Sequence, residues 1–155
     1  MMETLVIQPD KNSMKQVEEF VDAVCYNNHL DNYLATISVP VIKVVQDTLK
    51  SSHNAASNEP VTVSTEYCHE GICFTVHSYQ NCFSQFSSSF PLQSSLNSFF
   101  DSIQVVKLLV DEFEILDNGS TLRMVFFVRG IDAKEASRRK EVLRLFYQPA
   151  MVESN

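Results

Sequence analysis

Two pairs of strand-like runs, each joined by a short turn, constrain the fold of this chain more than any other feature. Residues 61–67 and 72–79 alternate apolar and polar side chains on either side of the tetrapeptide CHEG. Residues 113–116 and 121–129 flank Asn118-Gly119, the strongest short-range turn signal in the sequence. Because hairpins join antiparallel strands, we expect a mixed, largely antiparallel sheet.

Helical patterns surround these hairpins. After a short apolar strand at residues 3–8, a helix capped by Ser13 is predicted, and a second helix begins near Pro40. A third is predicted at residues 95–110 and a fourth at residues 133–147. The element order β-α-α-β-β-loop-α-β-β-α predicts an α+β fold, a two-layer sandwich with the helices on one face of the sheet.

The apolar residues of the first two helices recur at the spacing of one buried face. In the first helix these are Met14, Val17, Val21, Val24 and Cys25, and in the second Val41, Val44, Val45, Thr48 and Leu49.

The last helix leaves two alternatives open. Its inward positions are predicted to be Ala136, Val142, Leu143 and Phe146, with Arg138, Arg139, Lys140 and Arg144 mostly on the opposite side. The helix either packs against its own domain or docks onto a second subunit or an acidic partner. We assign residues 1–131 to the main domain and residues 132–155 to a helical extension and tail of that same domain.

Charge and hydropathy restrict the partners. Lysine and arginine number 12 against 19 aspartate and glutamate residues, a formal net charge of −7 in 155 residues. A field of that sign repels phosphate backbones and anionic lipid, so we expect binding to neither nucleic acid nor membranes. The sequence contains no apolar run of the ~18–20 residues that a membrane span needs and no signal peptide, which predicts a cytoplasmic protein with reduced thiols.

Cysteine and histidine give no metal or nucleophile signature. Cys68, His69 and Cys73 lie close together, but their C-x4-C spacing is not that of a zinc knuckle, so we expect no metal and two thiols facing each other across the hairpin. No nucleophile elbow frames any pairing of a cysteine (Cys25, Cys68, Cys82) with a histidine (His29, His53, His69, His77).

Glycine is too scarce for a phosphate-binding loop. The chain has three glycines, Gly71, Gly119 and Gly130, which excludes a Walker A loop and a Rossmann fingerprint. Gly71 is predicted to supply a positive φ in the first hairpin turn. Between the hairpins, residues 80–93 are rich in Ser and Phe without a period, and we expect a long irregular loop with its own buried aromatic residues, Phe83, Phe86 and Phe90.

Two stretches carry a family resemblance. Residues 99–128 (FFDSIQVVKLLVDEFEILDNGSTLRMVFFV) resemble the pattern G-L-x-L-I-x-x-L-V-D-E-V-E…G-N-T-V-R-L of the histidine-kinase-like ATPase fold, in the small version found in anti-sigma-factor serine kinases. Residues 39–54 (VPVIKVVQDTLKSSHN) resemble the second helix of that family. The resemblance covers roughly residues 3–129 and implies that the Ser/Phe stretch at residues 84–90 stands where active relatives carry a nucleotide lid.

The resemblance also implies a degenerate nucleotide pocket. Asp47 falls at the position of the glutamate that activates the phosphoryl acceptor, and Ser51 at that of the asparagine that holds Mg²⁺. Ser78 replaces the aspartate that binds adenine, while Gln80 and Cys82 replace glycines that let the backbone approach the nucleotide. The second glycine motif, ahead of the third helix, is missing from residues 96–100.

These departures favour a non-catalytic regulator over an enzyme. The resemblance implies an anti-sigma-factor-like protein of a bacterial switch, with no cofactor, which binds a sigma factor or a STAS-type antagonist and pairs as a homodimer. The alternative is an ATP- and Mg²⁺-dependent serine kinase that uses Asp47 as its base. A third interpretation is an unrelated α+β domain with a coincidental element order.

Overall fold

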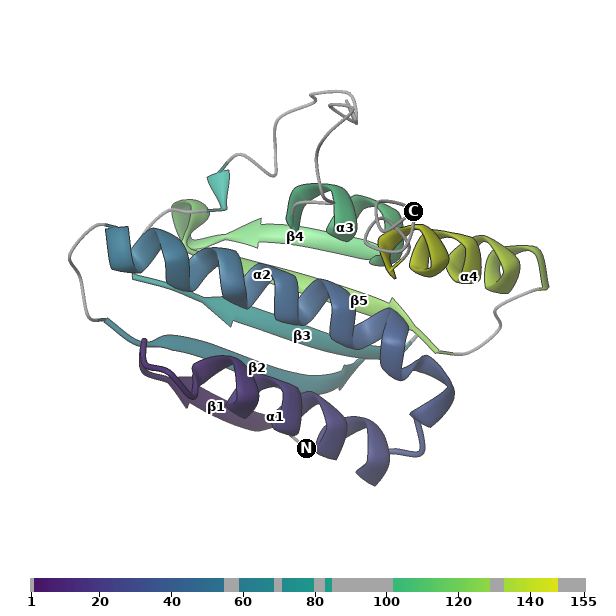
Figure 1. Ribbon diagram of the computed structural model, residues 1–155, viewed down its shortest axis with the longest axis horizontal. Helices are drawn as coiled ribbons and strands as arrows, with labels where there is room; N and C mark the ends of the chain where they lie inside the picture. The colour runs from purple at the N-terminus through teal and green to yellow at the C-terminus, as the bar shows by residue number, and fades with distance from the viewer. Residues whose placement is uncertain are drawn as a thin grey trace, which may run out of the picture.

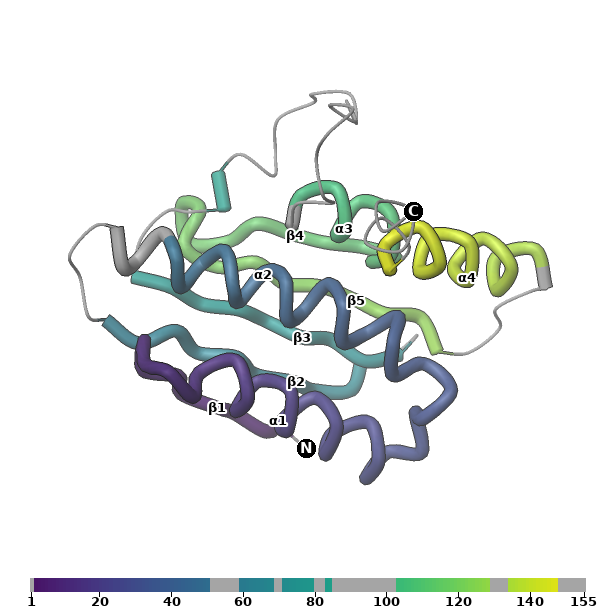
Figure 2. Tube along the Cα trace, in the orientation of Figure 1, coloured from purple at the N-terminus to yellow at the C-terminus, as the bar shows by residue number. Residues whose placement is uncertain are grey.

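Five strands form one sheet in the computed structural model, which describes residues 2–54, 59–68, 71–79, 83–84, 102–128 and 133–147 (Figures 1 and 2). The strands are β1 (Glu3–Ile7), β2 (Val61–Cys68), β3 (Gly71–His77), β4 (Glu112–Leu116) and β5 (Thr121–Phe127). The α-helices are α1 (Ser13–Asn27), α2 (Leu34–Asn54), α3 (Ser102–Leu109) and α4 (Ala133–Tyr147). Two short 3₁₀ turns, η1 (Asp31–Tyr33) and η3 (Asp117–Gly119), complete the described elements.

The sheet has the strand order β1-β2-β3-β5-β4, and the helices lie on one of its faces, which confirms the predicted α+β sandwich (Figure 1). Every pair of neighbouring strands among those described is antiparallel, so the sheet is not mixed. The reason lies in the connections. Two hairpins join β2 to β3 and β4 to β5, while the pair α1 and α2 carries the chain away and back, so that β2 enters from the end where β1 finished.

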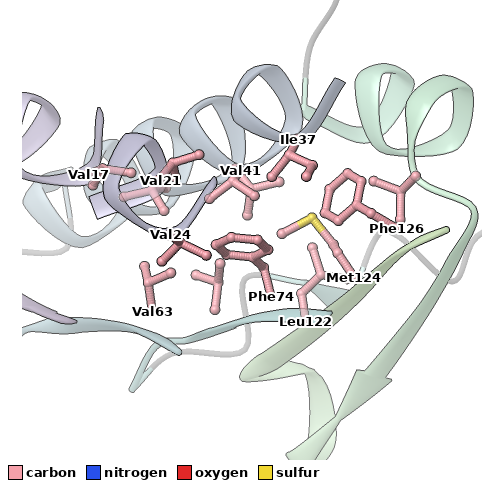
Figure 3. Packing of buried hydrophobic residues seen from close by; sticks show 14 of the residues in the cluster. Val17, Val21, Val24, Ile37, Val41, Val63, Phe74, Leu122, Met124 and Phe126 are labelled. Atoms are coloured by element: carbon pink, nitrogen blue, oxygen red, sulfur yellow. The ribbon is translucent and has the colours of Figure 1, made fainter. Parts of the chain in front are cut away.

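One main core fills the space between α1, α2 and the sheet (Figure 3). The predicted inner residues of α1 and α2 are buried, except Met14, which is partly buried against the core. From the sheet side, Val63, Phe74 and Met124 meet them, and each is fully buried. Each such side chain contributes about 1.5–3 kcal/mol on burial, so this core supplies the main stabilisation of the fold.

Helix α2 begins earlier than Pro40, at Leu34, so Pro40 lies inside the helix. Proline removes one backbone donor and disfavours a helix interior. Here the apolar side of α2 outweighs that cost, because Ile37 on the amino-terminal side of Pro40 and Val41 on the other are both fully buried.

Two local predictions about turns are wrong. Ser13 is the first residue of α1 rather than its cap, and its hydroxyl donates to the carbonyl oxygen of Asp10 at 2.9 Å. Gly71 lies in strand β3 and not in the turn, opposite Cys68 on one side and Phe127 on the other. A side chain at Gly71 would collide with the backbone of β5, since a Cβ atom there would lie 1.9 Å from the carbonyl oxygen of Phe126.

Helix α4 packs on its own domain, as the first of the two alternatives for this helix predicts. Val142, Leu143 and Phe146 contact a small second core formed by Val39 of α2 with Val105 and Leu109 of α3. Ala136, predicted to face inward, is exposed, whereas Arg139, predicted to face outward, is buried.

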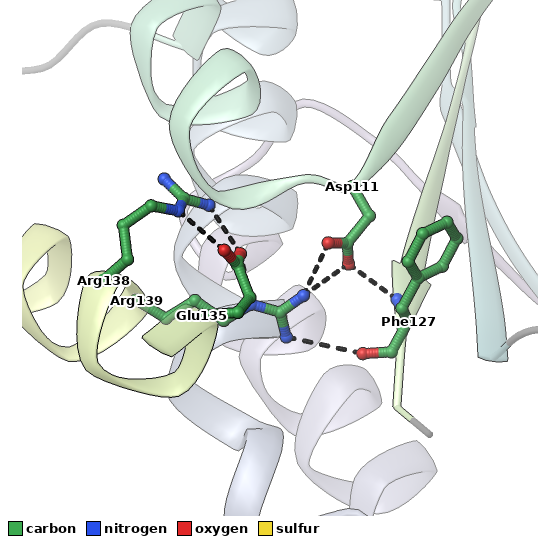
Figure 4. Close-up of polar contacts among 5 residues, drawn as sticks. All are labelled: Asp111, Phe127, Glu135, Arg138 and Arg139. Carbon is green, nitrogen blue, oxygen red and sulfur yellow. Dashed lines mark hydrogen bonds and ion pairs between the residues drawn. The ribbon is translucent and has the colours of Figure 1, made fainter. Parts of the chain in front are cut away.

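The position of Arg139 follows from its ion pairs. Its guanidinium lies 2.6 Å from the carboxylate of Asp111, and it also donates hydrogen bonds to the carboxylate of Glu135 and to the carbonyl oxygen of Phe127 (Figure 4). A buried arginine is tolerated when its donors are satisfied in this way. Within the described residues, no helix combines the length and apolar character that a membrane crossing needs.

Candidate functional site

The positions that the resemblance assigns to a nucleotide pocket come from one edge of the molecule. The carboxyl ends of α2 and β3 lie at the same side, on the left in Figure 1, beside the turn η3 between β4 and β5. Asp47 and Ser51 belong to the last turns of α2, and Ser78 follows directly after β3. The fold thus places at one edge two segments, around Asp47 and Ser78, that are 31 residues apart in the sequence.

Asp47 carries a counter-charge on its own helix. Its carboxylate lies 3.5 Å from the ammonium of Lys43, one helical turn earlier, and the two side chains are 32% and 22% exposed. Ion pairs of this spacing and exposure contribute only about 0.3–0.5 kcal/mol. The pair therefore contributes little to stability. It leaves a partly exposed carboxylate beside a cation at the edge where the pocket is expected.

The other pocket positions are defined to different degrees. Ser51 lies four residues after Asp47 and so on the same side of α2, but its side chain is outside the described residues. Gln80, Cys82 and residues 96–100 also lie outside the described residues. Their predicted role as replaced glycine positions stays a prediction.

Ser78 is held firmly against the β4–β5 turn. It is 1% exposed, and its backbone N–H donates to the carbonyl oxygen of Ser120 at 2.8 Å. Phe83 is anchored at the same turn, since its N–H donates to the carbonyl oxygen of Gly119 at 2.9 Å. The Phe83 side chain is buried, as predicted, but in the main core, whereas Phe86 and Phe90 lie outside the described residues.

Burial at Ser78 bears on what this position can bind. A carboxylate in so closed a place would lose its hydration and would need a strong donor, such as a ligand amino group, to offset the cost. The hydroxyl of Ser78 is neutral and has no such need. This position therefore lacks the charge that would select the amino group of a ligand.

A series of hydrogen-bonded side chains that sequence reasoning missed lies next to Ser78. Nδ1 of His77 is 2.7 Å from the hydroxyl of Thr121, and that hydroxyl donates to a carboxylate oxygen of Asp117 at 2.7 Å. Because the single hydroxyl proton of Thr121 is committed to Asp117, His77 must donate through Nδ1–H, which leaves Nε2 as an acceptor in the neutral ring. Tyr79 contacts the His77 ring edge-on, with centroids 5.6 Å apart.

This series of hydrogen bonds becomes visible only when the pairing of β3 with β5 is known. His77 and Thr121 are direct neighbours in the register of these strands, although they are 44 residues apart in sequence. Asp117 reaches them from a turn in which it adopts an unusual φ of 54°. A histidine oriented by a hydroxyl and a carboxylate can accept a hydrogen bond from a partner at the sheet surface.

Two of the described thiols, those of Cys25 and Cys73, are not poised as nucleophiles. Burial raises the pKa of Cys25 to about 11, with further contributions from Asp22 and Asp31. Burial also raises the pKa of Cys73 to about 12, followed by its hydrogen bond with Cys68. Both thiols are protonated near neutral pH, and a thiol is a far weaker nucleophile than a thiolate. Among the described side chains, no three His, Cys, Asp or Glu residues gather as a metal site.

The sequence matches no protein-family model and no curated protein.

The second candidate surface is the side of the sheet that faces away from the helices, called the open sheet face below. In its middle row, Thr4, Ser64, Thr75, Arg123 and Glu114 follow one another across all five strands. The neighbouring row contains Val6, Thr62, His77, Thr121 and Leu116. No described helix lies on this face (Figure 1). It combines small hydroxyl side chains with exposed apolar ones at its two edges, Val6 and Leu116.

Proposed function

We propose that this chain is a non-catalytic regulator of the anti-sigma-factor type, which acts in the cytoplasm by binding another protein. Its expected partners are a sigma factor or a STAS-type antagonist, and a second copy of the chain forms a homodimer. The proposal rests on the resemblance of residues 3–129, and the order of the described strands and helices agrees with it.

The observation that carries a binding function is the open sheet face. Five strands spaced ~4.8 Å apart, with about six residues of ~3.3 Å each, give a flat area of roughly 500 Å². Stable interfaces remove about 800 Å² of accessible surface from each partner, so this face and its rim approach that size. Most of its side chains are small, which allows another flat surface to approach closely.

The pocket edge supports the absence of catalysis. Phosphoryl transfer depends almost wholly on positioning and electrostatic stabilisation of the nucleotide. Ser78 offers a buried neutral hydroxyl in place of a carboxylate, and Asp47 is already paired with Lys43. These two departures from the family pattern support a non-catalytic role.

A thermal-shift titration with ATP and Mg²⁺ tests the non-catalytic part. A ligand at 100 times its Kd adds about 2.7 kcal/mol to the free energy of unfolding, so binding is easily seen. We expect no shift at millimolar ATP, either in the natural protein or in the Ser78→Asp variant. A Mg²⁺-dependent shift that Asp47→Asn leaves in place, together with serine phosphorylation that Asp47→Asn abolishes, would establish the kinase alternative.

A charge substitution on the open sheet face tests the binding part. Ser64→Lys adds a cation in the middle row, and Gln16→Lys adds the same charge to the exposed surface of α1. Light scattering gives the assembly state, and titration with purified sigma factors and STAS-domain proteins of the source organism gives partner affinity. We expect Ser64→Lys to weaken association at least tenfold and Gln16→Lys to leave it unchanged. Equal behaviour of the two variants would remove the open sheet face from the proposal.

A further inference from the structure

Two cysteines lie on the same face of the β2–β3 hairpin. In the register of these strands, Cys73 is opposite Glu66, and Cys68 is opposite Gly71. Because alternate residues of a strand point to the same side, Cys68 and Glu66 share a face, and the two thiols are diagonal neighbours. Both cysteines are free, and their thiols are hydrogen-bonded to each other.

The two thiols differ in their surroundings. Cys68 is half-buried and lines a hollow of about 460 Å³ at the end of the hairpin, together with Tyr33 and Tyr67. A small solute such as a peroxide fits in a hollow of that volume. Cys73 is buried, and Nη2 of Arg123 donates to its Sγ at 3.1 Å. One thiol therefore belongs to a partly exposed residue, while the other is enclosed and lies beside a cation.

We propose that Cys68 and Cys73 are a modification site that forms a reversible intramolecular disulfide when a peroxide reaches Cys68. In the first step, the Cys68 sulfur attacks one oxygen of hydrogen peroxide, the O–O bond breaks, and a sulfenic acid and water are formed. In the second step, the Cys73 sulfur attacks the Cys68 sulfur, the S–O bond breaks, and hydroxide leaves with the Cys73 proton as a second water. The two thiols are oxidised by two electrons and the peroxide is reduced.

The order of the steps follows from the state of Cys73. Its pKa is raised to about 12, mainly by burial and then by the hydrogen bond with Cys68, so Cys73 does not react first. Oxidation of Cys68 removes the second cause of the raised pKa, the hydrogen bond between the two thiols, while burial still raises the pKa and the contact with Arg123 favours the thiolate. Cys73 is then suited to attack its oxidised neighbour.

The diagonal geometry predicts a disulfide that is easily reduced. Diagonal partners across antiparallel strands are typically ~7–8 Å apart, whereas the Cα atoms of a disulfide usually lie about 4.4–6.8 Å apart. Closing the bond therefore needs a shift of the hairpin end, and strained disulfides are the more readily reduced ones. A reversible modification requires this property.

The test uses the full-length reduced protein, treated with excess hydrogen peroxide. We expect it to lose two of its four thiols and the mass of two hydrogen atoms, and to recover both on addition of reduced glutathione. Glutamate-specific proteolysis cuts after Glu66 and Glu70, which places Cys68 on the tetrapeptide YCHE and Cys73 on another fragment. The disulfide then appears as a single species that joins the two fragments.

Four variants assign the bond. Cys68→Ser and Cys73→Ser should abolish it, whereas Cys25→Ser and Cys82→Ser should leave it intact. Cys82→Ser is also needed because Cys82 lies on the same proteolytic fragment as Cys73. If Cys73→Ser does not fold, the result for Cys68→Ser, at the half-buried position, decides whether the bond involves this pair. The proposal is overturned if Cys82→Ser gives no cross-linked fragment, if the bond includes Cys25, or if Cys68 proceeds to the sulfinic acid with Cys73 unmodified.

Discussion

Gly71 is enclosed by backbone on both sides, because it pairs with Cys68 in β2 and with Phe127 in β5. The carbonyl oxygen of Phe126 lies where a Cβ atom would be placed, at 1.9 Å. Sequence reasoning assigns this glycine to the turn for its conformational freedom. In the structure the reason for glycine is the close approach of two central strands.

The first prediction follows from that contact. Gly71→Ala should lower the free energy of unfolding by about 3 kcal/mol, since the new methyl group forces β3 away from β5. Urea unfolding measures the loss, and Ser64→Ala on β2 is the control, with an expected change of less than ~0.5 kcal/mol. A Gly71→Ala protein as stable as the parent would mean that β3 and β5 lie farther apart than described.

Glu135 makes the free energy of unfolding depend on pH in the acidic range. Its pKa is lowered from the ordinary 4.5 to about 2, first by the hydrogen bond from Arg138 and then by that from Arg139. A carboxyl group whose pKa is depressed in the folded state stabilises the protein above its unfolded pKa and loses that contribution as the pH falls. The loss here is expected between pH 4.5 and about 2.

Glu135→Gln should therefore show a smaller decrease in stability between pH 4.5 and 2 than the parent protein. Urea midpoints at pH 7, 4.5 and 3 provide the comparison, with Glu18→Gln on the exposed side of α1 as the control. If the parent and Glu135→Gln lose stability in parallel, the ion pairs of α4 do not contribute to acid sensitivity.

Helix α4 is attached by one polar anchor and a small apolar contact. Arg139 and Asp111 are 6% and 11% exposed, and Asp111 also accepts a hydrogen bond from the backbone N–H of Phe127 at 2.7 Å. The anchor therefore links α4 to the start of β4 and the end of β5 (Figure 4). Substitution of Arg139 would leave the Asp111 carboxylate without its cation.

Arg139→Met should cost about 3–5 kcal/mol, because removing one partner of a buried ion pair leaves the other charge uncompensated. Arg138→Met is a matched control on the same helix, since Arg138 is 46% exposed and its pair with Glu135 is worth at most ~1 kcal/mol. Unfolding in urea, followed by circular dichroism, measures both. Equal and small effects would show that α4 is held by Val142, Leu143 and Phe146 alone.

These elements show how far the sequence predicts the structure. The inner residues of α1 and α2 follow from a local period, so Val17, Val21 and Val44 are correctly placed. Arg139 is not, because its partner Asp111 is 28 residues away and no pattern within α4 indicates it. The candidate site also contains residues that the sequence predicts and residues that it does not. Element order places Asp47 and Ser78 at one edge, whereas the contact of His77 with Thr121 depends on strand register.

In the whole molecule, β3 and β5 are central and β1 and β4 are the edges. Central strands are paired on both sides and covered by the main core, so their amides open only in large unfolding events. Edge strands have a row of unpaired groups on one side. The sheet is therefore expected to be most stable along the β3–β5 contact.

Hydrogen exchange should report this difference. Amides of β3 are expected to exchange at least a hundredfold more slowly than the outward-facing amides of β4, as measured by mass spectrometry of short peptides. Exchange in β3 as fast as in β4 would contradict a single cooperative sheet and would instead indicate that the β4–β5 hairpin and the β1–β3 sheet open separately.

The pairing of β3 with β5 also closes a long stretch of chain, from His77 to Thr121, and the hydrogen bond from Phe83 to Gly119 fastens it near its start. Once the ends of a flexible segment are fixed, doubling its length costs only about 0.6 kcal/mol of closure entropy. A change in the number of residues between Ser84 and Ser102 therefore costs little closure entropy, because the β3–β5 pairing and the Phe83 hydrogen bond are fixed outside that stretch. Insertions and deletions among homologues should concentrate there, while the β3–β5 register stays the same.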